Sequence, residues 1–307
     1  MRPYREAIVL AGGFGTRLAH VVPDVCKPMA SVAGRPFLRF IMDQLAASGF
    51  DRAAVADGYR REQIEDFFGF AYRGIAVEYS PEDTPLFTGG AVKKALRRCQ
   101  SDWVFVLNGD TWLDTDFAAM EVAAADAHED VSAIIAVKRM HGFERYGTVD
   151  VDSGGALTAF HEKRPCEEGF INAGVYLLRG DALDGMPEKF SLESDYFERV
   201  VGDGPLRAVE CEGGFIDIGF SGTTSSPRRC LRLLPNPGSS PCSTATARST
   251  LTPGTCTSRR SWSCSPPRST SCAATPRTPT TRSWWPTRPA SPRAFTPRPT
   301  CASYTVT

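Results

Sequence analysis

The chain has 307 residues and a formal net charge of zero, and its length suits one large domain or two small ones. This zero is the sum of an acidic first part and a basic second part. Residues 1–219 hold all 35 Asp and Glu and carry a net charge of −12, whereas residues 220–307 hold 12 Arg and no Lys, Asp or Glu. No stretch approaches about 20 apolar residues and no long apolar run follows the N-terminus, so we expect neither a transmembrane helix nor a signal peptide. The acidic first part also argues against nucleic acid as a partner.

Strand and helix patterns alternate through residues 1–219. Short apolar runs predict strands at residues 7–10, 53–56, 75–79, 103–107, 131–138 and 147–151. Helical spacing predicts helices at residues 37–48, 61–68 and 91–99, the last after a Gly-Gly turn. This alternation predicts an α/β fold with a mostly parallel sheet and helices on both faces, whose ligands bind at the carboxyl ends of the strands. The cysteines of this part show no metal-ligand spacing, which is compatible with a reducing cytoplasm.

A glycine-rich motif follows the first predicted strand. It reads Leu10-Ala11-Gly12-Gly13-Phe14-Gly15-Thr16-Arg17-Leu18. Glycines let the backbone approach a ligand, free N–H groups can cradle phosphate oxygens, and Arg17 supplies a planar charge suited to a triphosphate. An ordinary strand-to-helix turn explains three glycines equally well, and the motif is neither a G-x-G-x-x-G fingerprint nor a P-loop.

Charged residues mark three further motifs. Lys27, in an irregular loop before Pro28, can neutralise a phosphate under attack, although a solvated surface lysine is the commoner meaning of this motif alone. Asp110 follows the strand at residues 103–107, and Asp217 stands between apolar residues. Together these two carboxylates can hold Mg²⁺ against phosphate oxygens. An Asx turn is the alternative explanation of Asp110.

Polar residues between these two aspartates are candidates for contacts with a sugar phosphate. They are Glu162, Lys163 and Asn172. Glu162 and Lys163 alone are more often a surface pair.

In this order and at these spacings, the motifs resemble those of the sugar-1-phosphate nucleotidyltransferase family across nearly all of residues 5–219. The resemblance implies a Rossmann-like nucleotidyltransferase fold and Mg²⁺ as cofactor. It also implies transfer of a nucleoside monophosphate to a sugar 1-phosphate, with in-line displacement of pyrophosphate. Further segments resemble family members that use GTP and D-glycero-α-D-manno-heptose 1-phosphate. These segments are residues 21–24, 27–30, 34–38, 145–149 and 190–193.

The resemblance implies a role for each motif residue on the nucleotide side. Backbone around Ala11, Gly12 and Gly13 would hold the base and ribose, within a loop that also includes Leu10, Gly15 and Thr16. Arg17 would bind the β- and γ-phosphates, and Lys27 the reacting phosphates. Gly89 and Gly90 would line the base pocket. One departure is visible, because Phe87 stands where the family commonly has glycine.

On the acceptor side, the resemblance implies that Asp110 and Asp217 hold Mg²⁺. It implies contacts with the sugar phosphate for Gly147, Glu162, Lys163 and Asn172. Other pairs of substrates stay open, namely UTP, CTP or ATP with mannose or glucose 1-phosphate. A non-catalytic nucleotide-sugar-binding regulator on the same fold is also open. Such a protein could lose any of Arg17, Lys27, Asp110 and Asp217, and all four are present. We expect a cytoplasmic protein without membrane partners; a homo-oligomer stays open.

The composition changes abruptly after Gly219. Residues 220–307 hold six of the ten Cys and 14 of the 23 Pro, too little aliphatic surface for a core, and we expect a largely disordered tail there. Back-translation into the neighbouring frame permits motifs that resemble heptose bisphosphate phosphatases of the haloacid dehalogenase family. We therefore predict a nucleotidyltransferase domain at residues 1–219 and an out-of-frame product at residues 220–307. The alternative is a genuine basic tail that binds nucleic acid or membrane.

Overall fold

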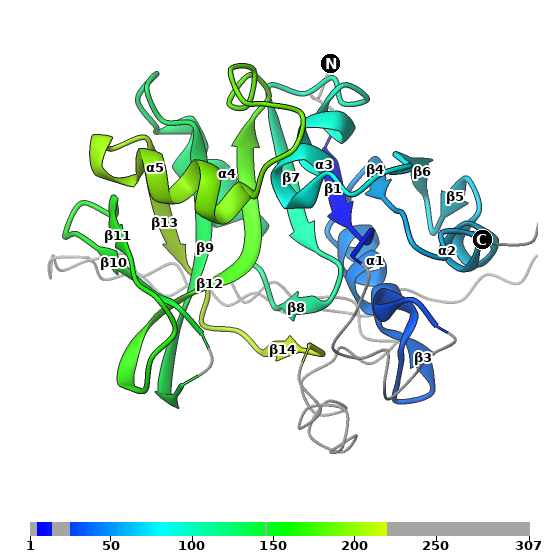
Figure 1. Ribbon diagram of the computed structural model, residues 1–307, viewed down its shortest axis with the longest axis horizontal. Coiled ribbons are helices and arrows are strands. Elements are labelled where there is room, and N and C mark those ends of the chain that lie inside the picture. Colours follow the sequence, from blue (N-terminus) through cyan, green and yellow to red (C-terminus); the bar gives the residue numbers. More distant parts are fainter. Residues whose placement is uncertain (1–4, 14–24, 145, 220–307) are drawn as a thin grey trace, which may run out of the picture. The chain divides into compact units, whose positions relative to one another are not determined.

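A mixed sheet separates two layers of helices. The computed structural model describes residues 5–13, 25–144 and 146–219, all within one compact unit. In the described part the strand order is β11-β10-β12-β7-β1-β4-β6-β5, with β9 paired to β12 and β13 paired to β9 (Figure 1). The strands of this sheet are β1 (Glu6–Leu10), β4 (Arg52–Ala56), β5 (Ala71–Tyr72), β6 (Ile75–Tyr79), β7 (Trp103–Asn108), β9 (Ala133–Phe143), β10 (Thr148–Val151), β11 (Leu157–Phe160), β12 (Cys166–Arg179) and β13 (Leu206–Glu210).

Shorter pairs and the helices complete the described part. Two small sheets pair β2 (Ser31–Val32) with β3 (Arg35–Pro36), and β8 (Thr111–Leu113) with β14 (Phe215–Asp217). The α-helices are α1 (Phe37–Ala47), α2 (Glu62–Phe68), α3 (Phe87–Leu96), α4 (Phe117–Ala125) and α5 (Glu198–Val200). A 3-10 turn covers Lys27–Met29, another covers Val201–Asp203, and a π-helix covers Leu192–Phe197.

The centre of the sheet is parallel, as the alternation predicted. β1 lies between β4 and β7 and is parallel to both, and β4 is parallel to β6. The carboxyl ends of β1, β4 and β7 therefore open on one edge of the sheet. β12 runs antiparallel to β7 and to β9, and the sequence patterns did not identify it as a strand.

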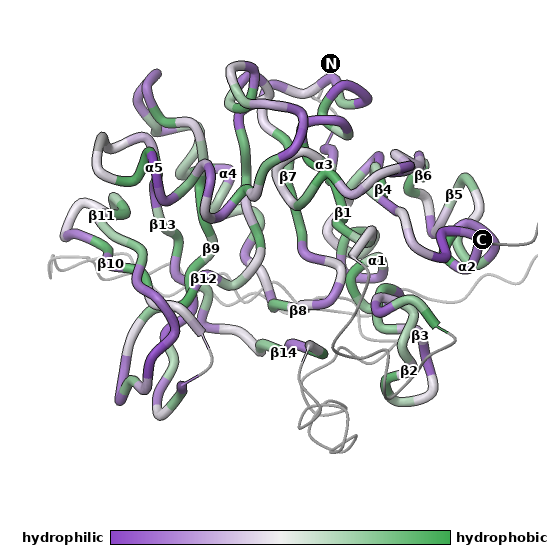
Figure 2. Tube along the Cα trace, viewed as in Figure 1, coloured by the Kyte–Doolittle hydropathy of each residue, from purple (hydrophilic) through white to green (hydrophobic). Residues whose placement is uncertain are grey.

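Alternating side chains divide the core into two layers. Ala7 and Val9 of β1 pack with residues of α1, α2 and α4, whereas Ile8 packs on the opposite face with residues of α3 and the π-helix. Hydrophobic and hydrophilic stretches alternate along the chain accordingly (Figure 2). This arrangement confirms helices on both faces of the sheet. No helix among the described residues is both long and apolar enough to cross a membrane.

One helix begins earlier than its pattern predicted. Gly89 and Gly90 were expected to form a turn before a helix at residues 91–99, but both lie inside α3. Their N–H groups donate to the carbonyl of Phe190, at 3.0 and 3.2 Å, and a Cβ on Gly89 would overlap the Phe190 ring. The glycines allow this close packing of α3, a long-range contact that local sequence does not reveal.

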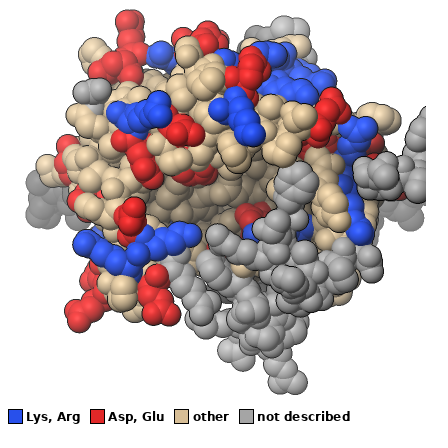
Figure 3. Space-filling model, in the orientation of Figure 1, with Lys and Arg blue, Asp and Glu red and all other residues tan. Residues whose placement is uncertain are grey.

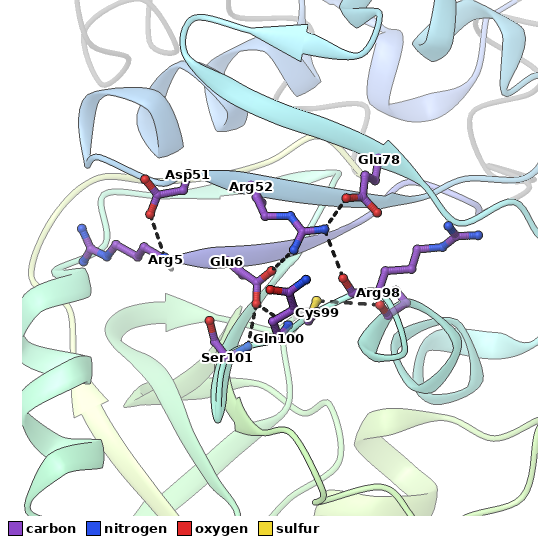
Figure 4. A network of polar contacts seen from close by, with 10 residues as sticks. Arg5, Glu6, Asp51, Arg52, Glu78, Arg98, Cys99, Gln100 and Ser101 are labelled. Atoms are coloured by element: carbon purple, nitrogen blue, oxygen red, sulfur yellow. Dashed lines mark hydrogen bonds and ion pairs between the residues drawn. The ribbon is translucent and has the colours of Figure 1, made fainter. Parts of the chain in front are cut away.

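Two carboxylates are buried among the described residues, and their surroundings differ sharply. Glu6 at the start of β1 is 2% exposed and fully partnered. It accepts hydrogen bonds from Arg52 Nη1 at 3.0 Å and from the N–H groups of Gln100 and Ser101 at 2.6 and 2.7 Å (Figure 4). Arg52 also pairs with Glu78. This network ties β1 to β4, β6 and the segment before β7, at the edge of the sheet opposite to the carboxyl ends.

Substituting Glu6→Ala removes the acceptor of the Gln100 and Ser101 N–H groups and one of the two carboxylate partners of Arg52. We expect the free energy of unfolding to fall by about 3 kcal/mol, measured by urea denaturation. Arg97→Ala is the matched control, because it breaks a pair with Glu188 whose two side chains are more than half exposed, and it should cost under about 1 kcal/mol. Equal losses in the two variants would contradict the role given to the buried network.

Asp57, directly after β4, is the second buried carboxylate. It is 0% exposed, and within the described residues neither carboxylate oxygen has a hydrogen-bond partner. Burial, and then the nearby charge of Glu65, raise the pKa of Asp57 to about 6. In the unfolded chain an Asp titrates near a pKa of about 3.9. The folded state therefore binds this proton more tightly. The stability that results is full below about pH 4 and is lost as the pH rises through 6.

Substituting Asp57→Asn removes this titration. We expect its free energy of unfolding, relative to the wild type, to rise by about 2 to 3 kcal/mol between pH 4 and pH 8. Urea denaturation at several pH values measures the difference. Asp83→Asn, which changes an exposed carboxylate, should show no such trend. A difference that does not change with pH would contradict the raised pKa of Asp57.

Candidate functional site

The glycine-rich segment leaves β1 at the carboxyl edge of the sheet. The N–H of Ala11 donates to the carbonyl of Ala56 at 2.7 Å and so holds the segment against the end of β4. A Cβ on Gly12 would lie 2.6 Å from Oε1 of Glu82, so glycine is needed beside that carboxylate. The predicted phosphate-binding residues Gly15, Thr16 and Arg17 lie outside the described residues.

Lys27 and Asp110 meet beside this segment. Lys27 begins the 3-10 turn, and its Nζ donates to Oδ2 of Asp110. Asp110 stands between β7 and β8, where the Thr111 hydroxyl donates to its other oxygen at 3.2 Å. The sequence is dense in β-branched and aromatic residues before this point, so a buried strand delivers the carboxylate to the edge of the sheet. A cation and an anion thus face each other where ligands of parallel sheets bind.

Asp217 reaches the same point from the far end of the domain. β14 is antiparallel to β8, with Asp217 opposite Thr111, and the N–H of Ile218 donates to the carbonyl of Asp110 at 3.0 Å. The N–H of Gly219 donates to Oδ1 of Asp217 at 2.6 Å. Burial, and to a lesser degree the charge of Asp110, raise the pKa of Asp217. The predicted pairing of the two aspartates is therefore present in space.

Two cavities open at this edge and share a boundary. The Gly12 cavity, about 470 Å³, has Gly12, Glu82 and Phe87 in its wall. The Asn172 cavity, about 670 Å³, has Asn172 and Asp217 in its wall. A space-filling view shows this face hollowed, with acidic and basic atoms at the floor of the hollow (Figure 3). The two cavities have in common Lys27, Asn108, Asp110 and Glu193.

Most of the predicted site residues that the structure describes line these cavities. The Gly12 cavity is lined by Leu10, Ala11, Gly12, Gly13, Lys27 and Asp110. The Asn172 cavity is lined by Lys27, Asp110, Gly147, Glu162, Lys163, Asn172 and Asp217. The exceptions are Gly89 and Gly90, which face residues 188–190 and belong to neither described wall. In the structure these two glycines make a packing contact of α3, and their place in a base pocket stays a prediction.

A β-bulge aims Asn172 into its cavity. The register between β12 and β9 shifts between Asn172 and Tyr176, and Gly174 adopts a left-handed φ of 74°. A Cβ on Gly174 would lie 2.7 Å from Nδ2 of Asn108, so glycine is needed there. The side chain of Asn172 is fixed on both sides, since Oδ1 accepts from the N–H of Gly174 and Nδ2 donates to the Tyr176 hydroxyl, both at 3.0 Å.

Glu193 was not predicted as a site residue, although it belongs to a segment that carried the family resemblance. It lies on the π-helix, a form of helix that is frequent at functional sites. Its carboxylate accepts from the hydroxyls of Thr88 at 2.6 Å, Ser191 at 3.2 Å and Tyr176 at 3.3 Å. The network joins α3, at the Gly12 cavity, to β12, at the Asn172 cavity. Only the fold brings these residues together.

The donor set suits a metal ion that shares its coordination with phosphates. Within the described ranges, no group of three or more His, Cys, Asp or Glu side chains gathers to hold a metal. Asp110, at the boundary of the two cavities, and Asp217, in the wall of the Asn172 cavity, offer two carboxylates, and both are half-buried. Mg²⁺ in nucleotide enzymes is bound through one or two carboxylates, with phosphate oxygens and water completing its shell. The two aspartates therefore fit such an ion.

Comparison with known proteins agrees with this geometry. D-glycero-α-D-manno-heptose 1-phosphate guanylyltransferase of Aneurinibacillus thermoaerophilus is 40% identical over 217 residues, covering 70% of this chain and 93% of that protein. The protein of the same name from Campylobacter jejuni is 38% identical over 216 residues, covering 70% and 94%.

Solved structures agree as well. HddC from Yersinia pseudotuberculosis matches with a TM-score of 0.67 and 30% identity, covering 74% of this chain and 99% of that one. HddC complexed with GMP-PN matches with a TM-score of 0.66. A family model described as nucleotidyl transferase matches residues 6–212. Fold, site and relatives agree, and the chain belongs to the nucleotidyl transferase family.

Proposed function

We propose that this protein transfers GMP from GTP to D-glycero-α-D-manno-heptose 1-phosphate and releases pyrophosphate. The observation that carries the proposal is the shared boundary of two cavities at Lys27 and Asp110, because a two-substrate phosphoryl transfer needs two sites that meet at one phosphorus. The choice of GTP and heptose is supported by the two guanylyltransferases of that name and by the GMP-PN complex of HddC.

The chemistry requires positioning more than proton transfer. An oxygen of the sugar phosphate attacks the α-phosphorus of GTP and forms a new P–O bond. The bond to the bridging oxygen of the β-phosphate breaks, and pyrophosphate leaves with the electron pair. A sugar phosphate is already anionic at neutral pH, so the attack needs no strong general base. Lys27, held in place by Asp110, would neutralise negative charge that develops at the α-phosphate.

Asp110 and Asp217 are the residues that would hold Mg²⁺ in this protein. The bound ion would supply further neutralisation of the phosphates. Gly219 keeps this corner narrow, since a Cβ there would lie 2.8 Å from Oδ1 of Asp217 and 2.9 Å from Nζ of Lys27. The triphosphate roles of Gly15, Thr16 and Arg17, and a location in the cytoplasm, remain predictions from the sequence.

Pyrophosphate release by the full-length chain tests the proposal. With Mg²⁺ and D-glycero-α-D-manno-heptose 1-phosphate, we expect release with GTP and much less with ATP, UTP or CTP. Chelation with EDTA should abolish the release, and added Mg²⁺ should restore it. Asp110→Asn should lower kcat by at least about 100-fold, because it loses charge at the reacting phosphates.

Asp130→Asn, an exposed carboxylate outside both cavities, is the matched control and should behave as the wild type. Thermal unfolding of each variant confirms that it is folded. Preference for UTP or CTP would overturn the choice of base, and GTP turnover that survives Asp110→Asn would overturn the assignment of the site.

The Asn172 cavity is the proposed place of the sugar phosphate. Substituting Asn172→Ala removes a donor and an acceptor from its wall, and we expect KM for the sugar phosphate to rise about tenfold while KM for GTP stays within about twofold. Gln100→Ala, an exposed amide at the opposite edge of the sheet, is the control. An equal rise of both KM values would show that Asn172 does not separate the two substrates.

A further inference from the structure

Phe87 combines a left-handed backbone conformation with a large, exposed apolar side chain. It is the first residue of α3 and has a φ of 61°, in the left-handed region that bulky side chains seldom adopt. Its side chain is large and apolar, yet the residue is 58% exposed. Strained backbone of this kind persists where the surroundings impose it, and it is concentrated at ligand-binding sites.

Hydrogen bonds on both sides of Phe87 impose this conformation. The N–H of Leu86 donates to Oε2 of Glu82 at 2.9 Å, and the Leu86 carbonyl accepts from the N–H of Phe190 at 3.2 Å. On the other side, the Thr88 hydroxyl donates to Glu193 and accepts from the N–H of Leu192 at 2.9 Å. Because Leu86 and Thr88 are held by these hydrogen bonds, the backbone of Phe87 is already ordered before a ligand binds. Binding at the ring therefore costs little further conformational entropy.

The place is the wall of the Gly12 cavity. The phosphate end of this cavity is the boundary at Lys27 and Asp110, so a nucleotide that reaches this boundary extends its base toward the rest of the wall. That remaining wall includes Gly12, Glu82 and Phe87. Phe87 is the aromatic residue of the described wall of this cavity, and an aromatic ring offers a flat surface on which any nucleobase can stack.

A lysine steadies the ring. Nζ of Lys189 lies 4.8 Å from the centroid of the Phe87 ring, a cation–π contact from the segment that packs against Gly89 and Gly90. Phe87 as a residue nevertheless keeps more than half of its accessible surface. Its exposed surface is therefore available to a ligand, while its position is held.

We propose that the ring of Phe87 is the platform on which the base of the bound nucleotide stacks. The inference rests on the proposed function for the presence of a nucleotide in the Gly12 cavity. It adds a specificity-determining residue, because a purine offers a larger stacking surface than a pyrimidine. Stacking of the base on this ring would offset the backbone strain of Phe87 at the start of α3.

The experiment measures thermal stability and nucleotide affinity, which Phe87→Gly should change in opposite directions. Phe87→Gly removes the ring and relieves the left-handed strain, so we expect a melting temperature a few degrees higher and a Kd for GTP raised about tenfold or more. Phe87→Ala removes the ring but keeps the strain, and should show the same loss of affinity without the stabilisation. Phe87→Tyr keeps a ring and should bind as the wild type. Direct binding of GTP, ATP, UTP and CTP to the full-length chain measures affinity without the sugar phosphate.

Two control variants separate the effects. Ala33→Gly, at another left-handed residue with a φ of 54°, should raise the melting temperature without changing nucleotide binding. Phe70→Ala removes a ring that is 82% exposed and lies outside the described walls of both cavities, and should leave nucleotide binding unchanged.

The outcomes also separate this inference from the proposed function. An unchanged Kd in Phe87→Gly and Phe87→Ala, with nucleotide bound by the wild type, would overturn the stacking role alone. A loss of affinity in Phe87→Gly that Phe87→Ala does not share would place the effect in the backbone and would also overturn it. A wild type that binds nucleotides through Phe87 but transfers no GMP would overturn the proposed function and leave the stacking role in place.

Discussion

The close approach of β1 and β7 at their carboxyl ends determines where the site lies. The N–H of Gly109 donates to the carbonyl of Leu10 at 2.8 Å, and a Cβ on Gly109 would lie 2.5 Å from that oxygen. The glycine-rich segment and the carboxylate of Asp110 therefore emerge next to each other. β8 follows at once and pairs with β14, which brings in Asp217 from more than a hundred residues away. A residue larger than glycine at 109 would separate the two strand ends and with them the two cavities.

The charges of the site are arranged so that a substrate completes them. Lys27 is close to Asp110, and Gly219 lies between Lys27 and Asp217, so one cation faces two carboxylates. Burial raises the pKa of Asp217, while the N–H of Gly219 and the charge of Lys27 lower it. A bound divalent cation would further favour the charged form of Asp217. Glu6, at the opposite edge, shows the contrasting case of a buried carboxylate whose partners are all within the protein.

Residues whose role depends on local sequence were predictable, and residues whose role depends on distant contacts were not. β1, β7 and α1 stand within a residue or two of their patterns, because their apolar spacing is strong and their ends are marked by glycine or polar residues. The pairing of Asp110 with Asp217 was predicted from their motifs; the structure places Asp217 opposite Thr111, next to Asp110, and a shared Mg²⁺ stays a prediction. Glu193 was missed because its partners are Thr88 and Tyr176, which only the fold brings near. The helical start of α3 was missed because its glycines serve a contact with Phe190. The domain boundary at Gly219 remains a prediction.

The start of α3 shows how stability and binding compete at one residue. Three sets of contacts fix the start of α3. They are the hydrogen bond from Leu86 to Glu82, the hydrogen bonds of Glu193 and the packing of Gly89 against Phe190. Each of them would tolerate glycine at position 87, and the backbone would be more relaxed with it. Phe87 belongs to neither core cluster of the described residues, and we expect its left-handed backbone to lower stability. A phenylalanine at this position is explained if the compensating contact is made with a ligand.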